Sequence, residues 1–333
     1  MAHRDPTSPP EGDLIQPHEM KEALQTSGYL LEGRVARLLE SRDFEVQLNC
    51  FWQDPRDQKQ SIEIDVLGCC SEVIDTQDMS MVFADLVIEC KNNSQPVAFF
   101  LQPQLRATSA HRIKYAGYPV SSADPETLRH VYLHDLLGMK DWHHYFQTRE
   151  VATQVCTFFR NTAVEEQKRK EKRLQGDRHL SREDWSWRAG PNESYSRSFA
   201  ALCAAVAGYA EDFPVASQNI DVAFYYPIIV FQGPIYAVRV KGTELDIEPT
   251  DHVQLLLSTS ISGRIVEAQG DVVSEQGFPS LVDTILAELR QVASGVKTHY
   301  ERLLTSAIDQ KQAAYDAAVL KSLYPSFGQG DRD

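Results

Sequence analysis

The chain has 333 residues, of which 42% are hydrophobic and 24% charged, a composition typical of globular proteins large enough to bury a sizeable core. The longest apolar run, residues 200–210, is too short to span a bilayer and is rich in small residues, which indicates a buried helix. The formal net charge of −14 argues against a protein that binds polyanions over its whole surface. Six cysteines without CxxC spacing, and an N-terminus without an apolar leader, indicate the reducing cytoplasm.

The charge is unevenly distributed along the chain. Residues 104–195 contain 15 Lys and Arg against 12 Asp and Glu, a net charge of +3, so the remainder carries −17. Three of the four tryptophans, Trp142, Trp185 and Trp187, lie in the same stretch. Basic and aromatic side chains are the ones that contact nucleic acids, so we expect any such contact to fall here.

The first hundred residues predict a helix followed by a meander of strands. Residues 1–17 are rich in proline near their start and are predicted to form a disordered tail. Residues 18–41 carry an apolar stripe at helical spacing, with Ser27 as a candidate cap. Strands are predicted at 44–52, from Ile62 onward and at 81–91, with a polar loop at 72–80 and a short apolar segment at 96–101.

The rest of the chain divides into an insertion, a second half of the core and a C-terminal segment. Residues 104–195 form the insertion, which is predicted to be mainly helical, at 124–137 and 142–172. The core, begun by residues 18–103, resumes over 196–275 with a helix at 196–211 and strands at 222–231, 235–240, 253–258 and 264–273. The helical segment of residues 276–333 contains an amphipathic helix at 279–304, continuing over 310–323.

Two of the predicted strands alternate between apolar and charged residues. In residues 61–68, Glu63 and Asp65 lie on the face opposite the isoleucines. In residues 85–91, the charged side chains share one face: Asp85, Glu89 and Lys91. If the two strands pair as a hairpin, carboxylates from both converge beside a lysine. This arrangement suits a divalent metal that prefers oxygen ligands.

These residues resemble the motif of the PD-(D/E)xK nuclease superfamily, which has the restriction-endonuclease-like fold. The matching positions are Glu32 in the first helix, Asp65 in one strand and Glu89-Cys90-Lys91 in the next. Ile64 stands where the name-giving proline would be. The resemblance spans residues 19–232, interrupted by the insertion. It implies an α/β fold with an αβββαβ core, in which helices flank a mixed central sheet.

The resemblance also implies a role for each site residue. Asp65 and Glu89 would bind Mg²⁺ directly, with the main-chain carbonyl of Cys90 as a third ligand and with Mn²⁺ able to substitute. Glu32 would hold a second ion or a water on the first one. Lys91 would orient or activate the attacking water and help to neutralise the scissile phosphate.

The expected function is therefore a cytoplasmic, metal-dependent nuclease that hydrolyses phosphodiester bonds in DNA. Without metal, the clustered carboxylates would repel one another and the phosphate, so metal dependence follows. The alternative is a catalytically inactive module of the same fold that binds or senses nucleic acid. The acidic net charge and the long C-terminal helix favour that alternative. No membrane partner is expected.

Several features allow more than one interpretation. Isolated acids on strands usually face solvent, but these lie in apolar strands, where a solvated charge is unexpected. Glu63 and Asp85 share faces with the site acids and could support them. The basic run 168–173 could hold phosphates or form a solvated helix, and the tryptophans could stack on bases or fill the core. The C-terminal helix could support a homodimer or pack on its own sheet. Four histidines could bind zinc or lie in the core or on the surface: His130, His134, His143 and His144.

Overall fold

The computed structural model describes most of the regions in which elements were predicted. The described residues are 15–27, 29–53, 61–75, 79–93, 95–103, 114–118, 121–123, 130–160, 187–191, 193–213, 220–261, 264–306, 309–310 and 312. Residues 1–14 of the predicted tail, the basic run 168–173 and the predicted helix over most of 310–323 lie outside them. No helix within the described ranges has the length and apolar character needed to cross a membrane.

The predicted N-terminal helix is two helices, α1 (Pro17–Thr26) and α2 (Tyr29–Glu40). Ser27 ends the first of them, since its backbone is extended and its hydroxyl donates to the carbonyl of Leu24 at 2.7 Å. The chain therefore turns where the sequence places a residue suited to capping. α2 buries its apolar stripe: Leu31, Val35, Ala36 and Leu39.

The predicted three-strand meander is confirmed. It consists of β1 (Glu45–Gln53), β2 (Ser61–Asp75) and β3 (Ser80–Asn92), paired antiparallel in sequence order. β2 is longer than predicted, because Glu72, Val73 and Asp75 continue the ladder with β3. The predicted loop at 72–80 is thus mostly strand, and cross-strand pairing outweighs the polar composition that suggested a loop.

The predicted helix–strand unit downstream is also confirmed. α6 (Glu193–Asp212) precedes β10 (Asp221–Gln232), which runs parallel to β3 over its whole length. β10 also pairs in parallel with β14 (Arg264–Ser274). Covered on both faces, β10 is buried from Val222 to Phe231, which explains its nearly continuous apolar sequence.

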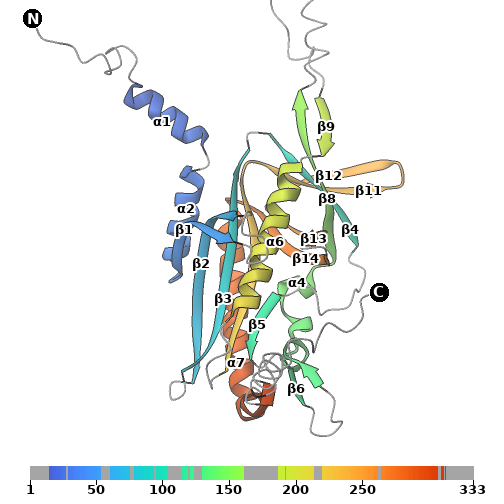
Figure 1. Cartoon of the computed structure of the whole chain (residues 1–333). Coiled ribbons are helices and arrows are strands. Elements are labelled where there is room, and N and C mark those ends of the chain that lie inside the picture. Colours follow the sequence, from blue (N-terminus) through green and yellow to red (C-terminus); the bar gives the residue numbers. More distant parts are fainter. Residues whose placement is uncertain are drawn as a thin grey trace, which may run out of the picture.

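The main sheet is mixed, has twelve strands among the described residues and is flanked by helices (Figure 1). Its strand order is β1-β2-β3-β10-β14-β13-β8-β4-β11-β12, with β5 beside β10 and β9 beside β8. A separate two-stranded sheet pairs β6 with β7. The strands not yet bounded are β4 (Val97–Pro103), β5 (Lys114–Tyr118), β6 (Ser121–Ala123), β7 (His130–Tyr132), β8 (Glu150–Arg160), β9 (Trp187–Pro191), β11 (Ile235–Lys241), β12 (Glu244–Thr250) and β13 (His252–Ile261).

Where the structure describes them, the long helices predicted within residues 104–195 are largely wrong, since only single helical turns form there. Residues 150–160 form β8, because this run is dominated by β-branched and aromatic side chains that fit a sheet. The only helices described there are single turns: α3 (Leu133–Leu136), the 3₁₀ turn η2 (Met139–Asp141) and α4 (His144–Gln147). Gly138, with a φ of 62°, ends the first of these turns. Several strands of this stretch join the main sheet.

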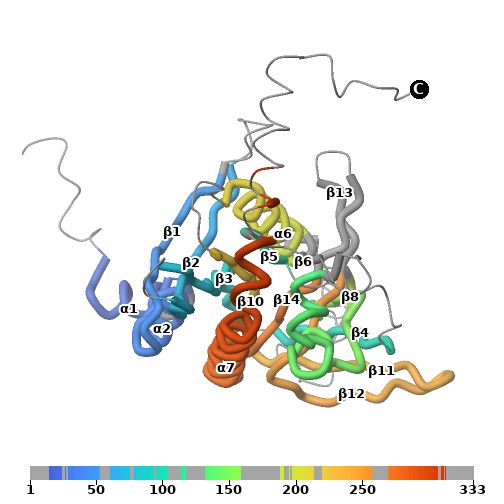
Figure 2. The backbone as a smooth tube through the Cα atoms, turned by 90° about the horizontal axis from the view of Figure 1, so that it is seen from below, coloured from blue at the N-terminus to red at the C-terminus, as the bar shows by residue number. Residues whose placement is uncertain are grey.

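Two apolar cores lie on opposite faces of the sheet. α2 and α7 (Phe278–Thr298) cover one face, and α6 covers the other. Figure 2 shows α6 and α7 on either side of β10. α7, which confirms the predicted C-terminal helix, buries its apolar stripe against β2, β3 and β14. Packing on its own sheet therefore accounts for its amphipathic pattern, and a homodimer through this helix stays a prediction.

Gly208→Ala is expected to lower the free energy of unfolding by about 1–3 kcal/mol, through overpacking. A Cβ on Gly208 in α6 would lie 2.1 Å from Cζ2 of Trp52, whose ring packs over the helix. Gly33→Ala in α2 is the matched control, because the nearest atom would lie 3.9 Å away. The control should gain up to ~1 kcal/mol from helix propensity. Urea unfolding compares the two, and equal stability of both variants would contradict the close contact with Trp52.

Candidate functional site

The predicted site lies where β2 and β3 part. Their ladder runs from Asp75 and Ser80 to Val66 and Ile88. Beyond that point β2 continues against β1, whereas β3 continues against β10. Ile64 belongs to the core beneath α6 and Val66 to the core beneath α7. The side chains before and after Asp65 therefore face opposite sides of the sheet, and the β2–β3 ladder has a gap beside residues 89–91.

Asp65 fills this gap with its side chain. Its Oδ2 accepts a hydrogen bond of 2.7 Å from the main-chain N–H of Cys90, two residues beyond the end of the β2–β3 ladder. Burial and then the charge of Glu89 raise the pKa of Asp65 to about 6, although the Cys90 amide acts in the opposite direction. The folded protein thus disfavours the charged form of the Asp65 carboxylate, and a nearby cation would stabilise that form.

Glu89 and Lys91 lie on the α6 side of β3. The Lys91 ammonium donates to Glu89 Oε1, and the Ser198 hydroxyl from α6 donates to the same oxygen at 3.2 Å. The side chains of Glu89 and Lys91 are 14% and 27% exposed, respectively. The pair is therefore sheltered and yet reachable from solvent.

Glu32 approaches the site from the first turn of α2. Burial raises its pKa first, followed by the charges of Glu63 and Glu89, while Lys91 opposes the shift. The start of α2 is tied to this end of β3, since the Asn92 amide donates to the Ser27 carbonyl at 3.1 Å. The structure thus brings Glu32, Asp65, Glu89 and Lys91 within electrostatic reach of one another.

The two supporting acids differ in position. Glu63 acts on Glu32 and so borders the site. Asp85 lies opposite Cys69 on β2 and is hydrogen-bonded to that thiol, away from residues 89–91. The Cys90 side chain faces the α7 side, where burial raises the pKa of its thiol. A role for the main-chain carbonyl of Cys90 stays a prediction.

The three site carboxylates are more widely spaced than a preformed metal centre. Among the described residues, one group of three potential ligands has all its ligand atoms within 4.8 Å of one another, and it is His143, His144 and Glu288. An ion bound by Glu32, Asp65 and Glu89 together would therefore have to draw these side chains closer.

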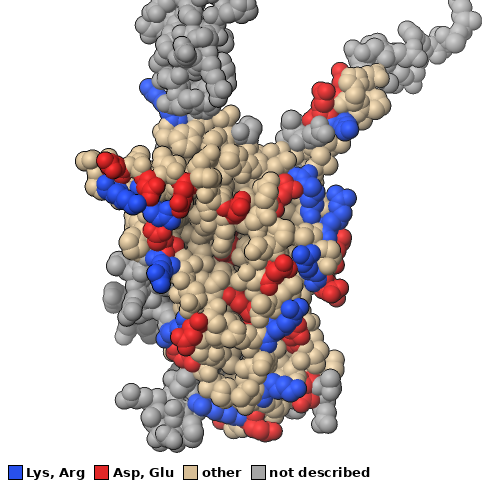
Figure 3. Space-filling view, turned by 180° about the vertical axis from the view of Figure 1, so that it is seen from behind, with Lys and Arg blue, Asp and Glu red and all other residues tan. Residues whose placement is uncertain are grey.

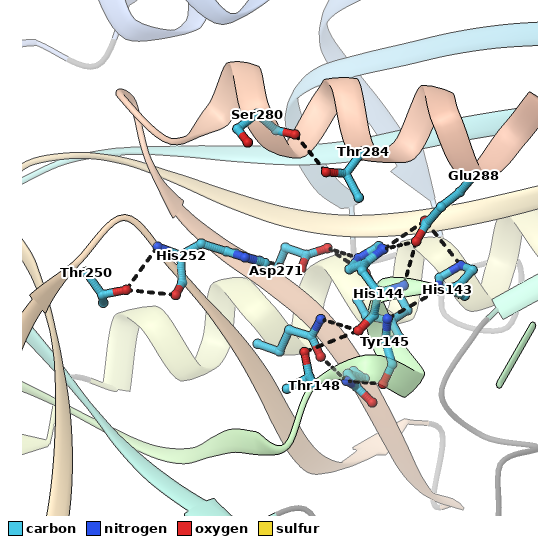
Figure 4. A network of polar contacts seen from close by, with 12 residues as sticks. His143, His144, Tyr145, Thr148, Thr250, His252, Asp271, Ser280, Thr284 and Glu288 are labelled. Carbon is cyan, nitrogen blue, oxygen red and sulfur yellow. Dashed lines mark hydrogen bonds and ion pairs between the residues drawn. The ribbon is translucent and has the colours of Figure 1, made fainter. Parts of the chain in front are cut away.

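The His143 cluster belongs to a buried polar network that the sequence reasoning did not assemble (Figure 4). His144 lies between two carboxylates, with Nδ1 2.8 Å from Glu288 Oε2 and Nε2 3.3 Å from Asp271 Oδ2. Asp271 also accepts from the Tyr145 hydroxyl at 2.8 Å, and its other oxygen lies 2.8 Å from His252 Nε2. α4, β13, β14 and α7 meet in this network.

The electrostatics of the network stabilise opposite charges in the interior. Burial alone would lower the pKa of His144, but Asp271 and Glu288 outweigh burial and raise it to about 10. Burial would likewise raise the pKa of Asp271, but His144 and His252 hold it well below its usual range. The pKa of His143 is lowered by burial and by its neighbour His144. His144 is therefore cationic, and His143 is neutral.

A signal for this network was present in the sequence. Asp271 precedes two valines in the apolar strand β14, and Glu288 lies in the buried stripe of α7 beside Ile285 and Leu289. A charge inside an apolar stripe indicates a buried partner. The predicted grouping with His130 and His134 was misleading, because His134 packs apart against Tyr115, and the side chain of His130 is not described.

The predicted nucleic-acid contacts fall largely outside the described residues, including residues 168–173, Trp185 and the side chain of Trp187. Trp142 packs against the α7-side core and donates to the Leu137 carbonyl at 3.1 Å, as expected of a core-filling residue. On the face shown in Figure 3, the basic side chains that are drawn in colour alternate with acidic ones.

Comparisons of the chain with family models, with curated proteins and with solved structures found no match.

Asp65→Asn is expected to stabilise the metal-free protein at neutral pH. The pKa of Asp65 rises from its ordinary 3.8 to about 6 on folding, so the folded chain holds this proton more tightly. The free energy of unfolding therefore falls as the pH rises through that interval. Asparagine can still accept the hydrogen bond from Cys90 but has no charge. With solvent screening taken into account, the free energy of unfolding of the variant should exceed that of the natural chain by about 1 kcal/mol above this pH interval.

Urea unfolding in the presence of EDTA, below and above this pH interval, measures the effect. The gain should appear only at the higher pH. Glu72→Gln, at a partly buried acid on the same strand, is the control and should show no such change. A gain of equal size at both pH values would mean that Asp65 is not under electrostatic strain.

Proposed function

We propose that this chain is a divalent-metal-dependent nuclease that hydrolyses phosphodiester bonds in DNA. The observation that carries the proposal is the placement of Asp65 and the Glu89-x-Lys91 pair at the point where β2 and β3 part. α2, β1, β2, β3, α6 and β10 occur in αβββαβ order along the chain, with the strands β4 to β9 and the turns α3, η2 and α4 between β3 and α6. β10 is parallel to β3. This order supports a restriction-endonuclease-like core.

The residues at this position fit a hard cation. Asp65 and Glu89 offer carboxylate oxygens on two strands, Glu32 adds a third, and the Cys90 carbonyl is the proposed main-chain ligand. A bound Mg²⁺ or Mn²⁺ would neutralise charge on the phosphate and activate the attacking water. The raised pKa of Asp65 supports this assignment, because a cation would relieve the repulsion between its carboxylate and that of Glu89.

Lys91 provides the remaining chemistry. Its ammonium now pairs with Glu89, which holds it at the site. In the proposed reaction, it orients the attacking water and donates to a phosphate oxygen, so its positive charge offsets the charge that develops there. Ser198 acts as a positioning residue, since its hydroxyl fixes the Glu89 oxygen that Lys91 also contacts.

The surroundings expected for this activity follow from the composition. All six cysteines are free thiols, which agrees with a protein that functions in the reducing cytoplasm. The acidic strands would by themselves repel the phosphates of DNA, so we assign substrate contact to the more basic residues 104–195.

A catalytically inactive module that binds or senses nucleic acid is the second candidate. The observation in its favour is that the site is internally satisfied: Cys90 donates to Asp65, and Lys91 and Ser198 donate to Glu89. Such pairing would let the same residues serve only the fold. Calorimetric titration with Mg²⁺ or Mn²⁺ separates the two candidates, since the nuclease requires binding that depends on Asp65 and Glu89.

The direct test is a cleavage assay with the purified full-length chain. Supercoiled, linear and single-stranded DNA, with RNA in parallel, are incubated with Mg²⁺, Mn²⁺ or EDTA. Cleavage of DNA with metal, and none with EDTA, supports the proposal. Metal binding without cleavage of any substrate would favour the inactive module. Cleavage of RNA alone would retain the chemistry and change the substrate.

A further inference from the structure

Three potential metal ligands converge in the buried polar network, far along the chain from the proposed nuclease residues. His143 and His144 begin the single turn α4, and Glu288 reaches them from α7 (Figure 4). Their ligand atoms all lie within 4.8 Å of one another. Two imidazoles and one carboxylate form a donor set that suits zinc and similar transition metals, and imidazole is a poor ligand for Mg²⁺.

His143 provides a second and independent observation. Its side chain is 0% exposed, and Nε2 has no hydrogen-bond partner. This nitrogen points into the cluster, where it lies 3.5 Å from Glu288 Oε2. Buried polar atoms without a partner are rare because they are costly, and each one calls for an explanation.

The spacing of these two atoms matches a shared ion. Two ligands on a tetrahedral zinc, each bonded at about 2.1 Å, lie about 3.4 Å apart. His143 Nε2 and Glu288 Oε2 are 3.5 Å apart, which is too long for a good hydrogen bond and suits two corners of such a tetrahedron. The orphan nitrogen is therefore placed where a ligand is needed.

Asp271 completes the pattern seen around metal-binding histidines. Metal-ligating imidazoles usually donate their other nitrogen to a carboxylate, which fixes the ring. With Nδ1 of His144 at the ion, Nε2 would donate to Asp271 Oδ2, which is 3.3 Å away. The Tyr145 hydroxyl and His252 hold Asp271 in turn.

We propose that His143, His144 and Glu288 form a structural binding site for a transition-metal ion such as Zn²⁺, which fastens α4 to α7. The site is distinct from the proposed nuclease centre. His143 and Tyr226 stack on the α7 side of β10, whereas Glu89 contacts Ser198 of α6 on the other side. A structural role follows from burial, since His143, Tyr145 and Asp271 are all 0% exposed.

Metal binding requires three local changes. The first is that His144, which is cationic without the ion, releases its Nδ1 proton to solvent, because a ligand nitrogen must be deprotonated. His144 Nδ1 now lies 2.8 Å from Glu288 Oε2, closer than two ligands of one ion, so these atoms must separate. The Tyr145 N–H now donates to His143 Nδ1 at 3.2 Å. A neutral imidazole bound through Nε2 carries its proton on Nδ1, so this contact must open. The amide of Tyr145 is therefore a specific reporter of binding.

The test begins with full-length protein stripped by a chelator and titrated with Zn²⁺ in a calorimeter. With Mg²⁺ in excess to occupy the proposed nuclease site, we expect one Zn²⁺ ion per chain, and a melting temperature that rises with the Zn²⁺ concentration. Titration with Co²⁺ reports the ligand type on the unaltered chain. Absorption from nitrogen and oxygen ligands without a sulfur-to-cobalt charge-transfer band supports this site, whereas such a band would assign the ion to cysteines and overturn it.

Variants locate the ion. Glu288→Gln and His143→Gln should each abolish the binding, and Asp271→Asn should weaken it about 10–100-fold by releasing His144. His18→Gln, on the exposed face of α1, is the control and should bind as the natural chain does. Circular dichroism checks that each variant is folded. Absence of Zn²⁺ binding by the unaltered chain, or binding that survives both ligand substitutions, would overturn the proposal.

Discussion

We expect Asp65→Asn and Lys91→Ala each to lower the rate of the proposed metal-dependent DNA cleavage on the order of 10³-fold or more. Asp65 offers its charge at the junction of β2 and β3, and without that charge the proposed cation would lose its carboxylate ligand from β2. Lys91 contributes differently, because its removal leaves the carboxylates in place but removes the ammonium that pairs with Glu89 and is proposed to contact water and phosphate. The first variant should therefore lose metal affinity, and the second should keep it.

Matched control variants test whether the loss of cleavage is specific to Asp65 and Lys91. Glu72→Gln removes an acid from the same strand as Asp65, and Lys297→Ala removes an exposed lysine from α7. Both should cleave at the natural rate. Metal titrations of all four variants distinguish loss of the ion from loss of Lys91. Because Asp65→Asn is expected to be more stable than the natural chain without metal, inactivity of this variant cannot be assigned to unfolding. Undiminished cleavage by either site variant would exclude the proposed mechanism.

The part of the fold near this site was predictable because it is encoded locally. The alternation of Ile62, Ile64 and Val66 with acids is a signal of period two, and the meander has short sequence separations. The single apolar face expected for these three residues is wrong, because Ile64 and Val66 belong to cores on opposite faces of the sheet. β10 was predictable for another reason. A strand buried on both faces has to be apolar throughout, and residues 222–231 satisfy this requirement.

The local sequence pattern did not reveal the strands within residues 104–195. β8 lies between β13 and β4, and each of these partners comes from a different part of the chain. Residues 153–158 of this strand are partly buried or exposed, so no clear alternation marks it. β12 was missed for a similar reason. Leu245 and Ile247 are exposed at the edge of the sheet, so neither a buried face nor a second neighbour shapes the sequence there.

The residues of the candidate site could be predicted from the sequence, but their hydrogen bonds could not. The spacing of Glu89 and Lys91 on one strand face follows from strand geometry alone. The main-chain donor to Asp65 depends on where the ladder is interrupted, which no local pattern records. The His143 network shows the same limit, because its members come from α4, β13, β14 and α7 and meet only in the folded chain.

Asp271→Asn or Glu288→Gln is expected to destabilise the metal-free protein by about 3–5 kcal/mol, because each leaves the buried His144 cation with one carboxylate fewer. Asp271 is 0% and Glu288 4% exposed, so water cannot replace the lost partner. His144→Gln should cost a similar amount, since it leaves two buried anions facing each other. The double variant His144→Gln/Asp271→Asn should cost clearly less than the sum of its two single variants.

The pH dependence of this loss identifies the charges. The pKa of His144 is raised from 6.5 to about 10, so its contribution to stability is complete below pH 6.5 and declines as the pH rises toward 10. The pKa of Asp271 is lowered from 3.8, so its contribution is complete above that value and declines at lower pH. The difference between the natural chain and Asp271→Asn should therefore be largest between these two ordinary values and shrink on either side. Urea unfolding across this range, in EDTA, measures it; a difference independent of pH would mean that the network is held by neutral hydrogen bonds.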